Sequence, residues 1–229
     1  MAVVHGRAGE WTRVRGSVFG LWPLFLCVFV LGFALAMALF AASFALMAFA
    51  LVLAVAALVG ASISLQKGFR CLERFMKGAR GEEHVSGILK SLPDAYHVFN
   101  GFVAAGRHVD HVVVGPAGVF AVETKFWRGK VTLDGRHVLF DGQLPDRDPI
   151  VQVQKKAAAV RAVLAAKGWT GAVTPVLAFA SDTFEAKIAE AQGVVVLNAN
   201  HLLESFSAGG VQLSTAEQTR LAQLMETQE

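Results

Sequence analysis

Three ionisable residues lie in a stretch of sequence that is otherwise typical of a protein core. Residues 108–125 read HVDHVVVGPAGVFAVETK, and this valine-rich run includes Asp110, Glu123 and Lys125. A buried charge costs several kcal/mol unless it is paired or bound to a metal. If this segment is a core hairpin, the protein must therefore compensate the charges, and a metal site or an ion pair would do so.

The spacing predicts which of these side chains meet. With a turn at Pro116 and Ala117, Asp110 is placed opposite Glu123, with Lys125 next along the same sheet face. Opposed Cβ atoms lie about 4.5–5.5 Å apart, so two like charges there repel each other. A divalent cation such as Mg²⁺ or Mn²⁺ would compensate the repulsion, and so would a shared proton. Asp110→Asn removes one of the two charges and so relieves the repulsion. We therefore expect this variant to keep the fold, or to be more stable by about 1 kcal/mol.

A third carboxylate precedes the hairpin. Residues 81–92 are predicted to form a helix in which Glu82 shares one stripe with Val85 and Leu89. Glu82 is therefore expected to face the sheet and to join the site, whereas Glu83 is expected to face water.

The elements that would position these residues alternate between strands and helices, which indicates a mixed α/β domain. Asp134-Gly135 is a turn signal, and Asp148, Pro149 and Gly168 are the boundary signals of a helix. We expect strands at 97–103, 173–180 and 193–198, a hairpin at 130–140, a helix at 148–168, and a last helix opening with a capping box at 214–217.

The N-terminal part of the chain has a different composition. No charged residue occurs from Gly16 to Gln66, and hydrophobic residues make up 54% of the whole sequence. One membrane span needs about 20 apolar residues, so the stretch is long enough for two, predicted at 17–39 and 43–64 with a turn near 41–43. A cleaved signal peptide is the alternative, but its apolar core is only about 7–15 residues long.

Basic residues flank this stretch on both sides, and basic flanks stay on the cytoplasmic side of a membrane. We therefore expect a multi-pass protein of the inner membrane whose N-terminus and C-terminal domain are both cytoplasmic. The basic residues after the stretch have helical spacing, which suits contact with anionic lipid; a nucleic-acid patch is the alternative. The preceding residues are Arg7, Arg13 and Arg15, and the following ones are Lys67, Arg70, Arg74 and Lys77.

These patterns divide the chain into four parts. They are a basic N-terminal segment at 1–16, a transmembrane hairpin at 17–65, a basic juxtamembrane segment at 66–80 and the α/β domain at 81–229. The net charge of +3 excludes the class of strongly basic nucleic-acid-binding proteins, which are recognised by their charge alone. Cys27 and Cys71 lack the spacing of a metal knuckle, and they fit a reduced, cytosolic setting.

Three blocks of the sequence resemble the signature blocks of the nuclease-related domain (NERD) family. They read GARGEEHVSGIL, HVDHVVVGPAGVFAVETKFWRG and DPIVQVQKKAAAV, in that order, and the resemblance covers roughly residues 78–205. It implies a restriction-endonuclease-like fold, a mixed central sheet flanked by helices, here preceded by two transmembrane helices. One departure is Val109, which stands where the wider superfamily has a proline.

The resemblance also implies a set of catalytic residues, namely Glu82, Asp110, Glu123, Lys125 and the helix glutamine Gln152. Asp110 and Glu123, with Glu82, would hold Mg²⁺ or Mn²⁺, which activates water and draws in the phosphate. Lys125 would orient or deprotonate that water or stabilise the transition state, and Gln152 would position a water or a phosphate oxygen. The expected function is hydrolysis of phosphodiester bonds in cytoplasmic nucleic acid, with DNA expected ahead of RNA.

Other interpretations of these residues stay open at this point. The same fold can be a non-catalytic module that binds nucleic acid or a membrane partner. Asp110 and Lys125 can form a structural ion pair, and His108 and His111 can be ordinary strand histidines. Trp127 can stack on a base or pack under the next hairpin.

Overall fold

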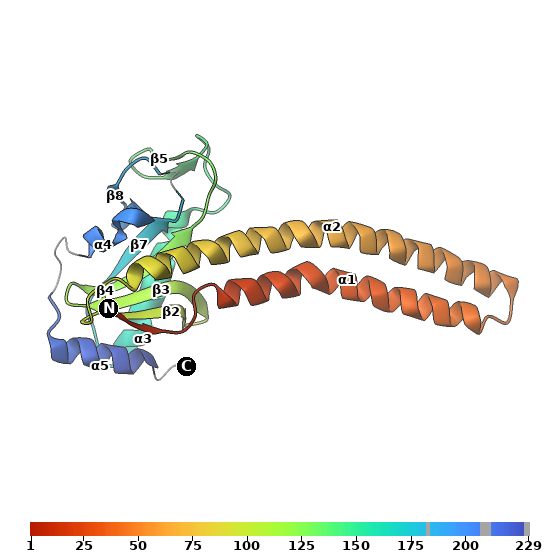
Figure 1. Cartoon of the computed structure of the whole chain (residues 1–229), viewed down its shortest axis with the longest axis horizontal. Helices are drawn as coiled ribbons and strands as arrows, with labels where there is room; N and C mark the ends of the chain where they lie inside the picture. The colour runs from red at the N-terminus through yellow and green to blue at the C-terminus, as the bar shows by residue number, and fades with distance from the viewer. Residues whose placement is uncertain (182–183, 207–211, 227–229) are drawn as a thin grey trace. The chain divides into compact units, whose positions relative to one another are not determined.

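The chain forms two compact units in a computed structural model that describes residues 1–181, 184–206 and 212–226. One unit comprises Met1–Glu10 with Gly78–Glu229, and the other is Trp11–Lys77. The first contains a mixed sheet with helices on both faces, and the second is a pair of long helices joined by a turn (Figure 1).

The two long helices are α1 (Glu10–Leu39) and α2 (Phe44–Leu89), and the turn between them falls where the sequence predicts it. Both are long and apolar enough to cross a membrane. Only 11% and 17% of their apolar windows are buried, whereas the core helix of a soluble protein would be mostly buried. A pair of candidate membrane helices at the N-terminus, as the composition predicts, is therefore present.

Glycines let α1 and α2 approach closely. Gly16 and Gly20 are buried and four residues apart, which is the small-residue spacing of tightly packed membrane helices. A Cβ atom added at Gly68 would overlap the carbonyl oxygen of Gly20, and one added at Gly16 would overlap the side chain of Phe75. The backbones of the two helices therefore pack directly on each other here.

The other unit is built on a seven-stranded mixed sheet, in agreement with the predicted fold class. Strands β2, β3 and β4 form an antiparallel meander, and β4, β7 and β9 run parallel to one another. The order across the sheet is β1 (Val3–His5), β2 (His97–Ala104), β3 (Arg107–Gly115), β4 (Gly118–Lys125), β7 (Val173–Phe179), β9 (Val194–Asn198) and β8 (Ile188–Ala191).

The register of the β3–β4 hairpin is the predicted one. Gly115 pairs with Gly118 across a turn at Pro116 and Ala117, and His111 pairs with Val122. The next position along the same register places Asp110 beside Glu123. A two-residue turn thus fixes which side chains share a face, because strand side chains alternate.

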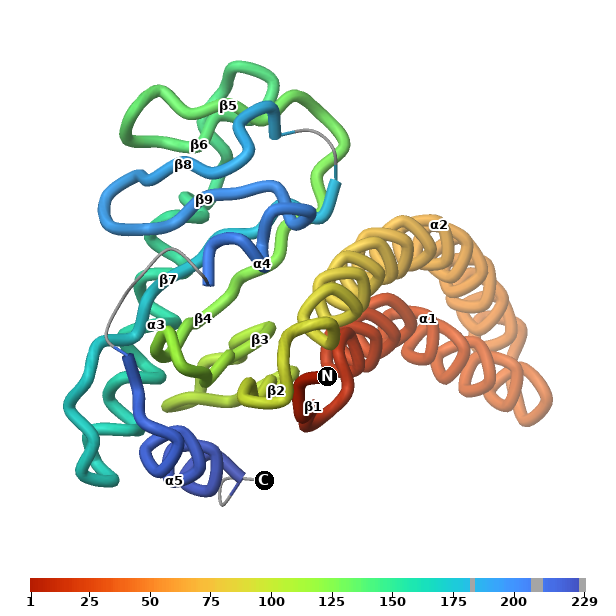
Figure 2. Tube along the Cα trace, turned by 60° about the vertical axis from the view of Figure 1, so that its left-hand side comes forward, coloured from red at the N-terminus to blue at the C-terminus, as the bar shows by residue number. Residues whose placement is uncertain are grey.

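A second hairpin, β5 (Val131–Leu133) and β6 (Val138–Phe140), forms a separate two-stranded sheet at the predicted place. Asp134 stabilises its turn, because one carboxylate oxygen accepts the N–H groups of Arg136 and His137 at 3.0 and 2.7 Å. The hairpin lies beside β8 and β9 (Figure 2).

Helices α3 (Pro149–Ala166) and α5 (Thr215–Glu226) pack on one face of the sheet. The Asp148 side chain caps α3 by accepting the N–H of Ile150 at 2.8 Å, and Ser214 and Glu217 form the predicted capping box of α5. The opposite face is covered by the short helices η1 (Ala199–His201) and α4 (Leu202–Ser205) and by the last turns of α2.

The helix predicted at 81–92 and the N-terminal segment both differ from the sequence-based expectation. The helix predicted at 81–92 is not a separate element: it is the end of α2, which runs unbroken through the basic segment 66–80 and ends at Leu89. The N-terminal residues are not only a basic segment, because β1 pairs in parallel with β2. Helix α2 is continuous because no proline interrupts it, and β1 is too short to show a strand period.

Candidate active site

The centre of the candidate site is a carboxylate pair, Asp110 on β3 and Glu123 on β4. Both are almost fully buried, with 6% and 4% of their surface exposed. Lys156 of α3 lies between them: its Nζ atom is 3.0 Å from Oδ1 of Asp110 and donates a second hydrogen bond to Oε2 of Glu123. Both carboxylates therefore lie on the face that α3 covers, and one ammonium group bridges them.

The electrostatics of this bridge favour the charged forms. Burial opposes ionisation of Asp110, but the Lys156 ammonium, the neighbouring His108 and the N–H of Thr124 outweigh it and hold the pKa of Asp110 well below its ordinary value. Burial likewise disfavours the ammonium of Lys156, and the charges of Asp110 and Glu123 outweigh it and raise the pKa of Lys156. The contact is a salt bridge between ionised groups.

Lys125 and Gln152 complete a hydrogen-bonded cluster around Glu123. Lys125 Nζ lies 2.7 Å from Oε1 of Glu123 and 3.0 Å from Oε1 of Gln152. Gln152 and Lys156 are four residues apart and therefore share one face of α3. Four of the residues that the sequence singled out, Asp110, Glu123, Lys125 and Gln152, are brought together in the structure.

Glu82 does not join this cluster. Its Oε2 atom accepts the backbone N–H of Gly9 at 3.1 Å. Val85 and Leu89, which share its helical stripe, pack in the cluster on the opposite face of the sheet, with Val113 and Val122 as neighbours. Within the described ranges, no three Asp, Glu, His or Cys side chains are grouped to hold a metal ion. The expected ligand set of Asp110, Glu123 and Glu82 is therefore not assembled.

His111 is an ordinary strand histidine, as the alternation of side chains predicts. Its Nδ1 atom lies 2.7 Å from Oδ1 of Asn100, and the ring is fully buried. Burial lowers the pKa of His111 to about 4, so the ring is neutral at pH 7. It adds no charge to the carboxylate pair.

Sequence reasoning missed Lys156. The sequence predicts that a metal ion or a shared proton compensates the repulsion between Asp110 and Glu123. The alternative is an ion pair between Asp110 and Lys125. The structure pairs Asp110 with Lys156 and Lys125 with Glu123. A signal was present in the sequence, because Lys156 lies one helical turn after Gln152 and must face the same way.

The chemistry of the pair suits a divalent cation. Mg²⁺ takes oxygen ligands and is commonly held by one or two carboxylates, with waters completing its shell. Asp110 and Glu123 provide two such groups, and the position of Lys156 shows that a positive charge is accommodated between them. The residues therefore fit Mg²⁺ or Mn²⁺ if the ammonium of Lys156 moves aside.

The fold and the cluster define a nuclease-like α/β domain with an acid–acid–lysine site. Residues 77–180 match the family model of the nuclease-related domain, so the chain carries a NERD domain over this segment, as its three sequence blocks predicted. The matched segment begins in α2, includes the whole cluster from Asp110 to Lys156, and ends just after β7. No curated protein and no solved structure matches the chain.

Proposed function

We propose that the protein is a membrane-anchored, divalent-metal-dependent nuclease that hydrolyses phosphodiester bonds of cytoplasmic DNA or, as the alternative, RNA. The observation that carries this proposal is the cluster of Asp110, Glu123, Lys125 and Gln152 in a NERD domain. A purely structural ion pair needs two residues, whereas here four polar side chains and Lys156 converge on one point of the sheet.

Each residue has a role that follows from its contacts. Asp110 and Glu123 would hold the metal ion, and a bound Mg²⁺ or Mn²⁺ would polarise the phosphate and acidify water. Lys125 is held by Glu123 and Gln152, so its ammonium is positioned to stabilise negative charge developing on the phosphate. Gln152 accepts from Lys125 through its carbonyl oxygen, which leaves its amide N–H₂ to orient a water or a phosphate oxygen.

The membrane location is part of the same proposal. Helices α1 and α2 would cross the inner membrane as a hairpin, which leaves both chain ends in the cytoplasm. Most of the basic side chains that follow the second apolar segment are exposed, as contact with anionic lipid headgroups requires. These residues are Lys67, Arg70, Arg74 and Lys77, of which Lys77 is partly buried.

Nuclease activity is tested directly on the full chain in detergent. Plasmid DNA, single-stranded DNA and RNA are incubated with the protein in EDTA, Mg²⁺ or Mn²⁺. We expect cleavage only with metal, and a loss of at least a hundredfold in Glu123→Gln, which removes one ligand charge. The matched control is Glu190→Gln, which changes an exposed glutamate of β8. Cleavage in EDTA, or equal activity of the two variants, would contradict the proposal.

A second candidate function is a non-catalytic module that binds nucleic acid or a membrane partner through the same fold. The observation that favours it is Lys156, whose ammonium lies where a metal ion would bind. In such a module the salt bridge would be permanent, and Mg²⁺ would not stabilise the protein. Thermal melting with and without Mg²⁺ therefore separates the two functions before any substrate is known.

A further inference from the structure

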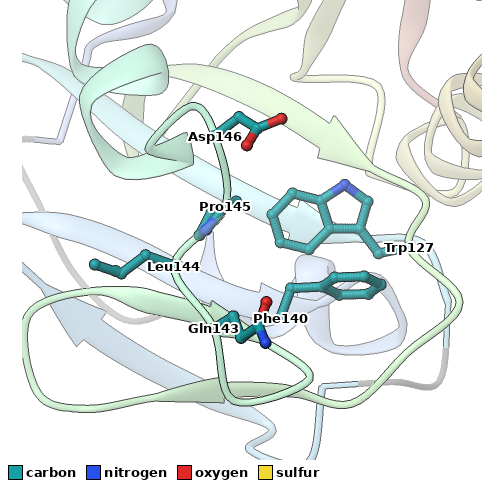
Figure 3. Close-up of a pocket in the computed structure, with 6 residues that line it drawn as sticks. All are labelled: Trp127, Phe140, Gln143, Leu144, Pro145 and Asp146. Carbon is teal, nitrogen blue, oxygen red and sulfur yellow. The ribbon is translucent and has the colours of Figure 1, made fainter.

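A pocket of about 340 Å³ lies between the end of β4 and the loop that leads into α3 (Figure 3). The indole of Trp127 and the ring of Phe140 form one side, and the loop residues approach from the other. Figure 3 shows Pro145 and Asp146 facing the indole, whereas Leu144 points away from it. The lining residues are Trp127, Phe140, Gln143, Leu144, Pro145 and Asp146.

The pocket and the candidate active site are built from neighbouring stretches of the chain. Trp127 is two residues beyond Lys125, and a chain spans at most about 3.6 Å per residue, so their Cα atoms are within about 7 Å. Asp146 lies two residues before Asp148, the N-cap of the helix that carries Gln152. We therefore expect a ligand in the pocket to lie near a phosphate held at Lys125.

The aromatic wall is fixed before any ligand binds. The Trp127 ring packs against Phe140 at 5.2 Å and against Phe179 at 5.5 Å between ring centroids. The hydroxyl of Ser181 donates to the carbonyl oxygen of Trp127 at 2.6 Å. Trp127 thus packs under the second hairpin and also presents part of its indole to the pocket, which combines the two roles considered for it.

The combination of groups suits a flat ring with a polar edge. An indole offers a stacking surface, and the Gln143 amide and the Asp146 carboxylate can hydrogen-bond to donors and acceptors on a ring edge. Exposed Arg128 directly follows Trp127, and exposed Arg147 directly follows Asp146, so two cations are available for flanking phosphates. These are the features with which proteins hold single-stranded nucleic acid.

We propose that this pocket binds one unpaired nucleobase of the strand whose phosphate enters the active site, so that the protein selects single-stranded or unpaired substrate. This proposal rests on the proposed function for the identity of the ligand as nucleic acid. A base inside a duplex is stacked and cannot reach the indole without being extruded, which breaks its stacking and pairing.

Binding is measured without cleavage, by fluorescence anisotropy of labelled oligonucleotides with the full chain in detergent and EDTA. We expect the protein to bind a single strand more tightly than a blunt duplex of two annealed strands, which has no unpaired base. Trp127→Leu should weaken single-strand binding by about 5- to 140-fold and leave duplex binding unchanged, because stacking contributes about 1–3 kcal/mol per base. Trp127→Phe should retain most of the affinity.

Two further variants separate stacking from loss of stability. Trp169→Leu is the matched control, because Trp169 is also partly buried but packs against a different hydrophobic cluster from Trp127, and it should bind like wild type. Gln143→Trp fills the pocket from an exposed position without disturbing the packing of Trp127, and it should lose single-strand binding as Trp127→Leu does.

The possible results also distinguish this proposal from the nuclease proposal. Equal affinity for single strand and duplex, or no effect of Trp127→Leu and Gln143→Trp, overturns the base pocket even if metal-dependent cleavage is observed. A Trp127-dependent preference for single strands supports the pocket even if no cleavage occurs, in which case the catalytic proposal alone fails.

Discussion

At the scale of single residues, the site is dominated by one lysine that balances two buried acids. Lys156 is 18% exposed, and its ammonium contacts both Asp110 and Glu123. Breaking a buried ion pair by removing one partner costs about 3–5 kcal/mol, because the remaining charge is left buried and unpaired. Lys156 therefore acts as a counter-ion that keeps the two carboxylates together in the absence of metal.

Lys156→Met is expected to lower the free energy of unfolding by about 3–5 kcal/mol in EDTA, since Asp110 loses its lysine partner and Glu123 keeps only Lys125. Mg²⁺ should stabilise the variant more than the wild type, because no ammonium competes for the same oxygens. Chemical denaturation in EDTA and in Mg²⁺ measures both effects. The control is Lys155→Met, an exposed neighbour on the same helix. A variant indifferent to Mg²⁺ would favour the non-catalytic module.

Asp110→Asn tests the same bridge from the other side. Repulsion between the two carboxylates alone predicts that this change is neutral or stabilising, but the contact with Lys156 reverses the expected sign. We expect a loss of about 1.5–3 kcal/mol, which is the value of a hydrogen bond to a charged group. Urea denaturation in EDTA measures it. A stabilised variant would show that Lys156 does not neutralise Asp110 in solution.

At the scale of elements, the packing of α3 on the sheet forms the site, and the packing of α1 on α2 forms the membrane hairpin. Helix α3 positions Gln152 and Lys156 over the start of β3 and the end of β4, which carry Asp110 and Glu123. The loop before α3 forms one wall of the pocket. In the hairpin, glycines set the spacing of α1 and α2. Strand β1 adds a further requirement: a fragment that begins at residue 78 lacks this strand and exposes the edge of β2.

Gly68→Ala is expected to push α1 and α2 apart, because the added methyl group overlaps the carbonyl oxygen of Gly20. Overpacking of this kind costs about 1–3 kcal/mol. Cys27 Sγ lies 3.9 Å from Oγ of Ser64, so oxidation of a Ser64→Cys background reports the helix spacing. Disulfide formation should be slower with Gly68→Ala and unchanged with Gly32→Ala, whose methyl group meets nothing within 4 Å. Equal rates would contradict the glycine contact.

At the scale of the whole molecule, the chain combines two apolar helices with a NERD domain whose site is polar and buried. Its net charge of only +3 gives weak long-range attraction to nucleic acid. Membrane attachment through the hairpin would therefore restrict the domain to nucleic acid that comes close to the membrane.

Topology is tested by labelling in intact cells. With both ends of the chain cytoplasmic, tags at Met1 and Glu229 should resist externally added protease, and a cysteine at Ala42→Cys in the turn should react with an impermeant maleimide. Cys71, beyond the second span, should stay unlabelled until the cells are permeabilised. Digestion of either tag would contradict the two-span arrangement.

The sequence by itself determined the features that depend on near neighbours. The hydropathy of residues 16–66 predicts two spanning helices, the Gly–Pro–Ala–Gly turn at 115–118 fixes the β3–β4 register, and Asp148 marks the start of α3. This register places Asp110 beside Glu123 on one face, because strand side chains alternate with a period of two.

The tertiary structure decided what joins that pair. Lys156 reaches it because α3 packs on the same face as both carboxylates, and Glu82 does not because the end of α2 packs on the opposite face. Glu82 and Lys156 have equally suitable positions on their own helices, and a helical stripe shows only that a side chain faces the sheet. Which face each helix covers depends on connections and packing along the whole chain, which no local pattern records.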